Sequence, residues 1–571
     1  MHYFYKGDLD EMHECLEHSF ALCEEDVCSV STLKQINFLM AKYIEETGDT
    51  PTAVKYYEEA IRLAETTRSH LNQSTKKVSY FFFLSTFYQS LVLALSDLND
   101  TTSALACAER AKARTFVDMM ETAMSLRAEV FPTDMQTVSQ VLKQLGNIQA
   151  AAEEPALGGL IGTSETRAGL AGASQRTQEE YQTILDELER ENPALGDTLS
   201  VNPERLADYS QDVERKMGKE TVALEYFVTD NETIVWVITQ DGIQTASRIA
   251  VSRDDLTEQV RGFREEIENQ PMPEQAAASY LSALEKGRDL YELLISPVEE
   301  YLNGATHLII IPSDVLFYLP FGALVNCPGC SKHDLYGGTF LIEDYSISYA
   351  PSMSSLYWPF QHAGDGTYDS ILAVGNPTGD LSAAEEEVKE AAALFPQSTV
   401  LIGEQGTEAV VKGALQTQNY DVVHLSTHGL FDTTMPLLSE LVFCAGGDDD
   451  GNLYAGEILG LPLETNLVVL SACQTALPPE LTEETEGLVV GDELQGLSQA
   501  LFVAGAPSAV LTLWNVNDLS TSQLMQMMYR GLQSEDRKGE ALRQAQLSLL
   551  QDPTYSHPYY WAPFVLYGDW R

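Results

Sequence analysis

His428 and Cys473 stand at matching points in two apolar stretches of this 571-residue chain. His428 ends the segment DVVHLSTH, and Cys473 ends the segment NLVVLSAC. A cysteine beside a histidine deprotonates more readily, and the histidine can then protonate the amine that leaves a broken peptide bond. The pair therefore indicates peptide hydrolysis with Cys473 as nucleophile. From spacing alone, a buried structural cysteine is the commoner interpretation.

Two neighbours of His428 enter the same hypothesis. Gly429 lets the backbone approach a substrate, and its N–H together with that of Cys473 is predicted to bind the oxyanion of a tetrahedral intermediate. His424 lies four residues before His428, so we expect it deeper on the same strand, as a core or supporting histidine.

The elements around these residues alternate regularly after residue 369. Apolar strands such as SILAVG, TVLIG and SAVLTLW are separated by amphipathic helices, which predicts a mostly parallel sheet covered on both faces. Functional groups of such sheets gather at the carboxyl ends of the strands. If the two strands that lead to His428 and Cys473 are neighbours, both side chains emerge at one edge.

Another strand-rich region precedes this one. From residue 221 the runs TVALEYFVTD, ETIVWVITQDG and IQTASRIAV are rich in β-branched residues and predict strands joined by tight turns. A helix is expected at about 279–302, followed by the buried strand HLIIIP at 307–312.

The first 120 residues contain three similar segments, GDLDEMHECLEHSFALCEE, GDTPTAVKYYEEAIRLAE and NDTTSALACAERAKAR. Each opens with a turn pair and then carries a small or apolar residue followed by another seven positions later, a spacing that lets helices pack closely. These pairs are Met12 and Ser19, Ala53 and Ala60, and Ala104 and Ala111. They predict degenerate tetratricopeptide-like repeats with lengthened helices; a plain helical bundle is the alternative.

Several motifs of the chain, taken together and in order, resemble the CHAT family of caspase-like cysteine peptidases. They are HLIIIPSDVLFYLPFGAL, FLIEDYSISYAPS, VVHLSTHG, LSACQTAL, SAVLTLWNVND and HPYYWAPFVLYGD. The resemblance implies that Cys473 is the nucleophile and His428 its general base and acid. It implies no third catalytic member, and the sequence offers no compelling one.

The resemblance also implies the domain organisation. We expect an α/β caspase-like sandwich, a mostly parallel sheet flanked by helices, with a preceding pseudo-caspase half and an N-terminal all-α repeat region. The expected boundaries are repeats at 1–125, a helical linker at 126–215 with a mobile Gly/Ala-rich loop at about 153–175, a catalytically silent half at 216–368, and the catalytic half at 369–571.

The substrate pocket is less well defined by sequence. Ser471 is small and would leave room for a substrate backbone, and Trp514 follows a strand end, where it forms either a pocket wall or ordinary core. Separases, which belong to the same clan, prefer a basic side chain before the scissile bond. Asp432 and Asp518 are the candidate partners of such a side chain, but Ser471 stands where relatives with an acidic pocket place the acid.

The charge balance excludes several classes of function. The chain holds 34 Lys+Arg against 85 Asp+Glu, a formal net charge of −51, so we expect no direct binding to nucleic acid or to anionic membranes. We interpret the acidity as adaptation to a salty cytosol, in which case activity requires high ionic strength. Recruitment of a basic partner is the alternative, and full activity at low salt would favour it.

Cysteine usage and apolar runs indicate a cytoplasmic protein without cofactors. The eight cysteines are mostly isolated, which is typical of a reducing compartment. No signal peptide is evident, and the apolar stretch at 80–95 is better explained as a buried helix. Cys327 and Cys330 with His333 form half of a zinc motif, but a turn with incidental thiols is the favoured interpretation, so no metal is predicted.

The sequence therefore predicts a cysteine endopeptidase that makes limited cuts in a dedicated protein and is latent until a partner engages the repeats. The resemblance implies a setting in prokaryotic stress or defence signalling, with gasdermin-like or CRISPR-associated factors as partners. A catalytically silent interaction scaffold is the alternative. The long acidic segment 478–492 is predicted to order over the groove on activation.

Overall fold

The computed structural model describes most of the chain outside one long central segment and several short ones. The described residues are 9–24, 29–68, 74–112, 203–272, 276–328, 337–364, 366–430, 439–447, 449–458, 461–471, 497–498, 500–502, 504–514, 518–534 and 536–571. The predicted Gly/Ala-rich loop at 153–175, the segment 478–492 and Cys473 lie outside them. The chain divides into two compact units, 1–205 and 206–571.

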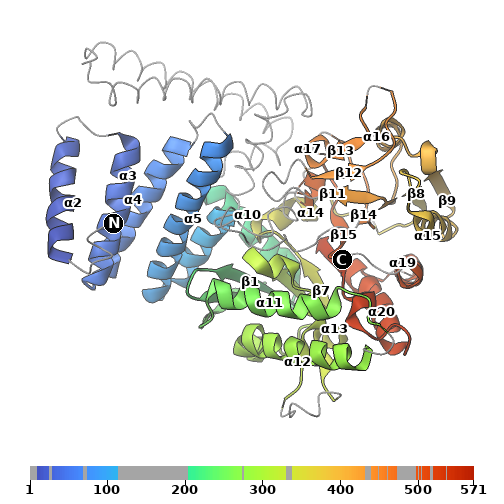
Figure 1. Ribbon diagram of the computed structural model, residues 1–571, viewed down its shortest axis with the longest axis horizontal. Coiled ribbons are helices and arrows are strands. Elements are labelled where there is room, and N and C mark those ends of the chain that lie inside the picture. The colour runs from blue at the N-terminus through green and yellow to red at the C-terminus, as the bar shows by residue number, and fades with distance from the viewer. Residues whose placement is uncertain are drawn as a thin grey trace. The chain divides into compact units, whose positions relative to one another are not determined.

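The first unit is helical, as predicted (Figure 1). Its helices are α2 (Leu9–Glu24), α3 (Val30–Glu46), α4 (Thr50–Arg68) and α5 (Ser74–Asp97), and residues 101–112 are also helical. The predicted close-packing positions Ala53, Ala60 and Ala104 are fully buried, and Met12 belongs to the core between α2 and α3. Ser19 and Ala111 are half-buried.

Two turns of this unit repeat one another bond for bond. Before α4, the Asp49 N–H donates to the Ile44 carbonyl at 3.2 Å, and before the next helix the Asp100 N–H donates to the Leu95 carbonyl at 3.0 Å. Each aspartate also accepts a hydrogen bond from the N–H three residues later, which caps the helix that follows. The repeat proposed from sequence is therefore present in the backbone.

The apolar stretch at 80–95 forms part of α5, whose described side chains from Leu84 onward are largely buried. None of the helices in the described ranges combines the length and apolar composition needed to cross a membrane. One expectation about the cysteines was wrong, because Cys23 and Cys327 are disulfide-bonded; isolated thiols had been expected from their spacing.

The second unit is built on a single eleven-stranded sheet (Figure 1), with the order β3-β2-β1-β4-β7-β16-β15-β14-β10-β8-β9. The leading strands are β1 (Thr221–Val228), β2 (Thr233–Thr239), β3 (Gly242–Ile249), β4 (His307–Ile311) and β7 (Ser346–Tyr349). The trailing strands are β8 (Ser370–Gly375), β9 (Gln397–Ile402), β10 (Val422–Ser426), β14 (Leu467–Leu470), β15 (Ser508–Thr512) and β16 (Phe564–Gly568).

The two halves of this sheet meet at β7 and β16. Strand β16 is parallel to β7 but antiparallel to β15, and β15, β14, β10, β8 and β9 are mutually parallel. Strands β1, β4 and β7 therefore run opposite to the trailing parallel strands. The carboxyl ends of β1, β4 and β7 consequently lie on the side of the sheet where the amino ends of β15, β14, β10, β8 and β9 lie.

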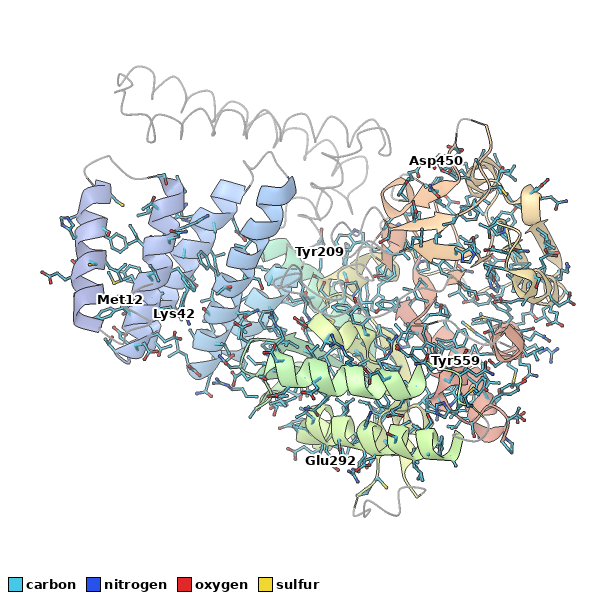
Figure 2. All side chains as sticks on the ribbon, in the orientation of Figure 1. Met12, Lys42, Tyr209, Glu292, Asp450 and Tyr559 are labelled. Carbon is cyan, nitrogen blue, oxygen red and sulfur yellow. The ribbon has the colours of Figure 1, made fainter. Side chains whose placement is uncertain are left out.

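Helices cover the sheet as the sequence predicts. The helices described in this unit, of which α15 and α20 pack directly on strands of the sheet, are α10 (Pro203–Met217), α11 (Arg253–Ile267), α12 (Ala276–Leu294), α13 (Leu341–Asp344), α14 (Tyr357–Gln361), α15 (Ser382–Ala392), α16 (Glu408–Thr417), α17 (Ala455–Ile458), α19 (Asp518–Gln533), α20 (Lys538–Gln551) and α21 (Pro558–Trp561). Side chains fill the space between these helices and the sheet (Figure 2). Large ones such as Trp236 and Trp561 are fully buried, and each stabilises the fold by about 1.5–3 kcal/mol or more.

Two small sheets also form among the described residues of this unit. One pairs β5 (Val325–Asn326) with β6 (Thr339–Phe340), and the other has the order β11-β12-β13, with β11 (His428–Leu430), β12 (Glu440–Val442) and β13 (Asn452–Tyr454). The single strand expected at 421–429 is therefore two strands, β10 in the main sheet and β11 in this small sheet. The chain leaves the main sheet at Thr427.

Candidate active site

Strand β10 lies between β8 and β14 and is parallel to both. Leu425 is in register with Leu470 of β14, and the Ser471 N–H donates to the Leu425 carbonyl at 3.0 Å. The two predicted strands are thus neighbours, which was the condition for a shared edge. His428 follows Leu425 by the same three residues as Cys473 follows Leu470.

His428 is the first residue of β11, opposite Val442 of β12. Its side chain is 35% exposed, and Nε2 lies 3.0 Å from each carboxylate oxygen of Asp380. A carboxylate only accepts hydrogen bonds, so this contact places the ring proton on Nε2. Nδ1 is then the nitrogen that can exchange a proton, and no hydrogen bond from the described residues occupies it.

Asp380 was missed by the sequence analysis, which named no third member. It lies in the connection after β8, the other neighbour of β10, so the rule that functional groups gather at strand ends points to it as well. Hydrogen bonds from the Thr378 hydroxyl and then from His428 hold the pKa of Asp380 below its usual value. Asp380 therefore carries a negative charge at neutral pH.

Asn376 shapes the connection that carries Asp380. It adopts a left-handed backbone conformation, with φ of 52°, which asparagine tolerates better than most residues. Its N–H donates to the Ser426 carbonyl at 3.0 Å, and its side-chain oxygen accepts from the Leu381 N–H at 2.6 Å. These bonds tie the loop after β8 to the end of β10, and thus bring Asp380 to His428.

A buried polar cluster, here called the Glu387 network, lies beneath this edge. Glu387 projects from α15, which packs on β8, β9, β10 and α19. Its carboxylate lies 3.1 Å from His424 Nε2 and accepts hydrogen bonds from Ser426 at 2.9 Å and Ser471 at 3.4 Å. His424 is fully buried, which confirms the prediction of a core histidine.

Tyr529 of α19 completes the network, with its hydroxyl 2.9 Å from His424 Nδ1. Burial, with a further contribution from the Glu387 charge, raises the pKa of Tyr529 well above its usual value. The phenol therefore stays protonated and can donate to Nδ1, which leaves the proton of His424 on Nε2, facing the carboxylate.

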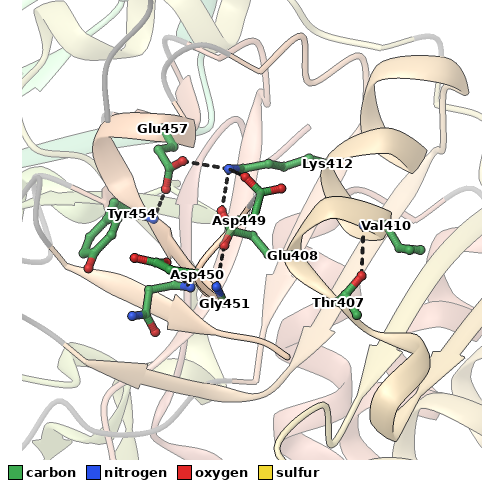
Figure 3. Close-up of polar contacts among 10 residues, drawn as sticks. Thr407, Glu408, Val410, Lys412, Asp449, Asp450, Gly451, Tyr454 and Glu457 are labelled. Atoms are coloured by element: carbon green, nitrogen blue, oxygen red, sulfur yellow. Dashed lines mark hydrogen bonds and ion pairs between the residues drawn. The ribbon is translucent and has the colours of Figure 1, made fainter. Parts of the chain in front are cut away.

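An ion-pair cluster anchors the small sheet that begins at His428 (Figure 3). Lys412 of α16 pairs with Glu408, with Asp449 at 3.2 Å and with Glu457 at 2.7 Å. Glu408 also accepts a hydrogen bond from the Gly451 N–H at 2.8 Å, in the turn before β13. The cluster thus ties α16 to the β12–β13 connection and to α17.

Burial by itself lowers the pKa of Lys412, but hydrogen bonds to Glu408 and Glu457 outweigh it and raise the pKa above the usual value. The lysine therefore remains charged at every physiological pH. Because β12 pairs with β11, a firm attachment of this hairpin also supports the backbone of His428.

The remaining predicted residues lie in different surroundings. Gly429 is in β11 opposite Leu441. Trp514 is buried; its Nε1 donates to the Tyr559 carbonyl at 3.2 Å, and the Arg264 guanidinium lies 4.8 Å from its ring centre. Asp518 is the first residue of α19, and Asp432 lies outside the described residues. Roles in oxyanion or substrate binding stay predictions for all of them.

The zinc half-site considered for 327–333 loses its first ligand, because Cys327 is disulfide-bonded. Cys330 and His333 lie outside the described residues. Elsewhere in the part of the chain that the structure describes, no group of three or more His, Cys, Asp or Glu side chains could hold a metal ion.

The second half of the chain matches a known protein family. Residues 284–569 match the CHAT domain, so the chain belongs to the CHAT domain family. This membership, together with the large sheet flanked by helices, confirms the predicted caspase-like fold class with its N-terminal helical repeats.

Individual relatives are more distant. The chain is 23% identical over 604 residues to tetratricopeptide repeat protein 28 of Homo sapiens, and 23% identical over 623 residues to the same protein of Mus musculus. Each match covers 91% of this chain but 24% of the relative, so the chain spans about a quarter of the length of these proteins. The Saccharomyces cerevisiae separase–securin complex is a structural neighbour, with a TM-score of 0.43 and 13% identity over 94% of this chain and 50% of that chain.

Proposed function

We propose that this protein is a cysteine endopeptidase whose Cys473 and His428 form the catalytic dyad. The observation that supports the proposal best is the arrangement of His428. It follows the carboxyl end of β10, beside the strand that leads to Cys473, and is oriented through Nε2 by Asp380. A half-exposed histidine held by a carboxylate is suited to general acid–base catalysis.

In the proposed reaction, His428 Nδ1 takes the proton of the Cys473 thiol, and the thiolate attacks the carbonyl carbon of the scissile peptide. The N–H groups of Gly429 and Cys473 bind the resulting oxyanion. His428 returns its proton to the leaving amine as the C–N bond breaks. Water, deprotonated by His428, then attacks the thioester, releases the acid product and restores the thiol.

Asp380 serves this cycle without touching the substrate. Its carboxylate keeps the ring proton on Nε2 and stabilises the imidazolium that forms after the thiol proton moves to Nδ1. Asp380 is 64% exposed, so solvent screens its charge, and its larger effect is on the orientation of the ring.

We further propose that the first unit binds the protein that activates the peptidase or presents its substrate. Helical hairpins that pack through small residues build extended binding surfaces. A cytoplasmic location, limited cleavage of one dedicated protein, and a role in prokaryotic stress or defence signalling remain part of this proposal, with gasdermin-like or CRISPR-associated proteins as the partners that the resemblance implies.

An alkylating activity probe tests the proposal directly. Peptide mapping after treatment of the full chain should find Cys473 labelled much faster than Cys15, an exposed free cysteine that serves as internal reference. Proteomes of cells that express the wild type or Cys473→Ala should then differ in a small set of cleaved proteins. Equal labelling of the two cysteines, with identical proteomes, would instead identify a silent interaction scaffold.

A further inference from the structure

The two strands that lead to the residues of the proposed dyad are joined by a buried carboxylate. Ser426 stands two residues before His428, and Ser471 stands two residues before Cys473. Both serine hydroxyls donate to the same oxygen of Glu387, Oε2, at 2.9 Å and 3.4 Å. One carboxylate thus binds the ends of both strands at equivalent positions.

The contact of Glu387 with the two serines is buried and can therefore hold the two strands at a fixed separation. Glu387 is nine-tenths buried, and Ser426 and Ser471 are buried as well. The other carboxylate oxygen is held by His424 at 3.1 Å, and that ring is in turn held by Tyr529. Every polar group of the network therefore has a partner, which makes the arrangement rigid, because in a low-dielectric interior an unpaired polar group is costly.

We propose that Glu387 is a positioning residue that sets the separation of His428 and Cys473 by binding the two strand ends through Ser426 and Ser471, an inference that rests on the proposed function. The reaction needs the imidazole nitrogen and the sulfur within hydrogen-bond reach. Backbone pairing between β10 and β14 fixes their register, but β10 ends at Ser426 and the chain that leads to His428 leaves the main sheet there. The buried carboxylate joins Ser426 and Ser471 through their side chains, in addition to this backbone pairing.

A second glutamate on the same helix provides a matched control. Glu390 lies one turn after Glu387 and accepts hydrogen bonds from Ser522 and, at 2.9 Å, from Gln526 Nε2. Those contacts join α15 to α19 and do not involve the strand ends. Glu390→Gln therefore perturbs helix packing with the same chemical change, at a distance from the dyad.

The experiment compares the labelling rate of Cys473 with that of Cys15 in the full chain, between pH 5 and 9, for the wild type, Glu387→Gln and Glu390→Gln. Positioning by Glu387 predicts that Glu387→Gln lowers the ratio of the two rates by roughly tenfold or more, since displacements near 1 Å cost about a hundredfold. The pH profile of Cys473 in this variant should move toward that of an ordinary thiol with a pKa of about 8.5. Glu390→Gln should leave both the ratio and the profile as in the wild type.

A double variant, Ser426→Ala with Ser471→Ala, keeps the test decisive if Glu387→Gln does not fold. It removes the same two hydrogen bonds and retains the Glu387–His424 contact, so it should reproduce the altered pH profile. Adding Glu387→Gln to it should cause little further loss, because groups that act through one another are not additive.

The possible outcomes separate the two proposals. A wild-type ratio and profile in both Glu387→Gln and the double variant overturns the positioning role but leaves the peptidase standing. An equal loss in Glu387→Gln and Glu390→Gln also overturns it, because a general packing effect then explains the result. A wild type in which Cys473 reacts like Cys15 overturns the proposed function, and the positioning role with it.

Discussion

The leading and trailing halves of the sheet each hold a histidine on or beside a strand, in contrasting environments. His307 begins β4, is buried, and has both ring nitrogens occupied by serine hydroxyls, Ser346 and Ser348, at 2.8 Å. His428 follows the carboxyl end of β10, is 35% exposed, and meets a carboxylate. The same residue type is thus a buried core group in one half, and in the other it is partly exposed and held by a carboxylate.

The strand ends differ in the same way. After β4, the chain forms a short 3-10 helix at Asp314–Tyr318, whose five residues are all buried and whose Asp314 pairs with Arg253 at 3.2 Å. After β8 and β10, the chain instead presents Asp380 and His428. The carboxylate that follows β4 is thus buried and paired with a cation, whereas the carboxylate that follows β8 is exposed and faces a histidine.

Substitution of either dyad residue is expected to cause the largest difference between the two halves, measured as loss of substrate cleavage. Cys473→Ala or His428→Ala should lower substrate cleavage by roughly a thousandfold or more, because removing the nucleophile or its base abolishes the covalent route. Cleavage in cells, scored by proteomics, measures the effect. His307→Gln is the matched change in the leading half and should leave the rate per folded molecule unaltered; a comparable loss there would break the distinction between the halves.

Asp380→Asn is expected to have the next largest effect. The amide retains the shape but no longer favours a proton on Nε2, so cleavage should fall by roughly tenfold to a hundredfold, less than the full 10²–10⁴ of general acid–base catalysis. Steady-state kinetics should show the loss in kcat rather than in KM, because Asp380 does not touch the substrate. Asp369→Asn, also in the trailing half but before β8, serves as control, and an equal loss in both variants would remove the special role of Asp380.

The Lys412 ion-pair cluster, which joins α16 to the β12–β13 connection and to α17, should contribute strongly to stability. Lys412→Met leaves Glu408, which is 2% exposed, and its two acidic neighbours without a cation, so the free energy of unfolding should drop by about 2–4 kcal/mol. Denaturant unfolding measures the drop. Lys389→Met removes an exposed cation from α15 and should cost at most about 1 kcal/mol; equal losses would contradict a structural role for the cluster.

Because the pKa of Lys412 is raised in the folded protein, its contribution to stability is complete below the unfolded pKa of about 10.4 and declines only as pH rises beyond that value. Between pH 6 and 9, the difference in unfolding free energy between wild type and Lys412→Met should therefore stay constant. A difference that varies strongly across this range would exclude the ion pairs as its cause.

An effect confined to acidic pH is expected from the buried histidines. Burial lowers the pKa of His307 well below its usual value and that of His557 to about 4, so the unfolded state binds more protons below about pH 6.5. Stability should decline as pH falls from there, by up to about 1.4 kcal/mol per pH unit for each histidine. Replacing His557 by Asn should flatten the decline between pH 6.5 and 4 in thermal unfolding; an unchanged slope would show that the folded protein accommodates the charged ring.

Much of the local structure could be predicted because it depends on neighbours along the chain. The turn pair at Gly48 and Asp49 caps the helix that immediately follows. A short apolar run such as that of β10 is typical of a buried strand. Whether β10 and β14 are neighbours was left open by the sequence, and the structure shows that they are. The break between β10 and β11 was not predicted, because β11 pairs with β12, which follows a connection without a clear sequence pattern.

The sequence by itself determined the class of fold, the helical repeats and the two residues whose chemistry defines the proposed peptidase. Tertiary structure alone decided that the two halves join as one sheet through β7 and β16, that Asp380 reaches His428, and that Glu387 binds beneath both strand ends. Asp380 and His428 are separated by 48 positions, and Glu387 and Ser471 by 84. Contacts of this kind depend on how helices and loops pack against the sheet. The periodicity of apolar residues predicts the helices and strands but not that packing.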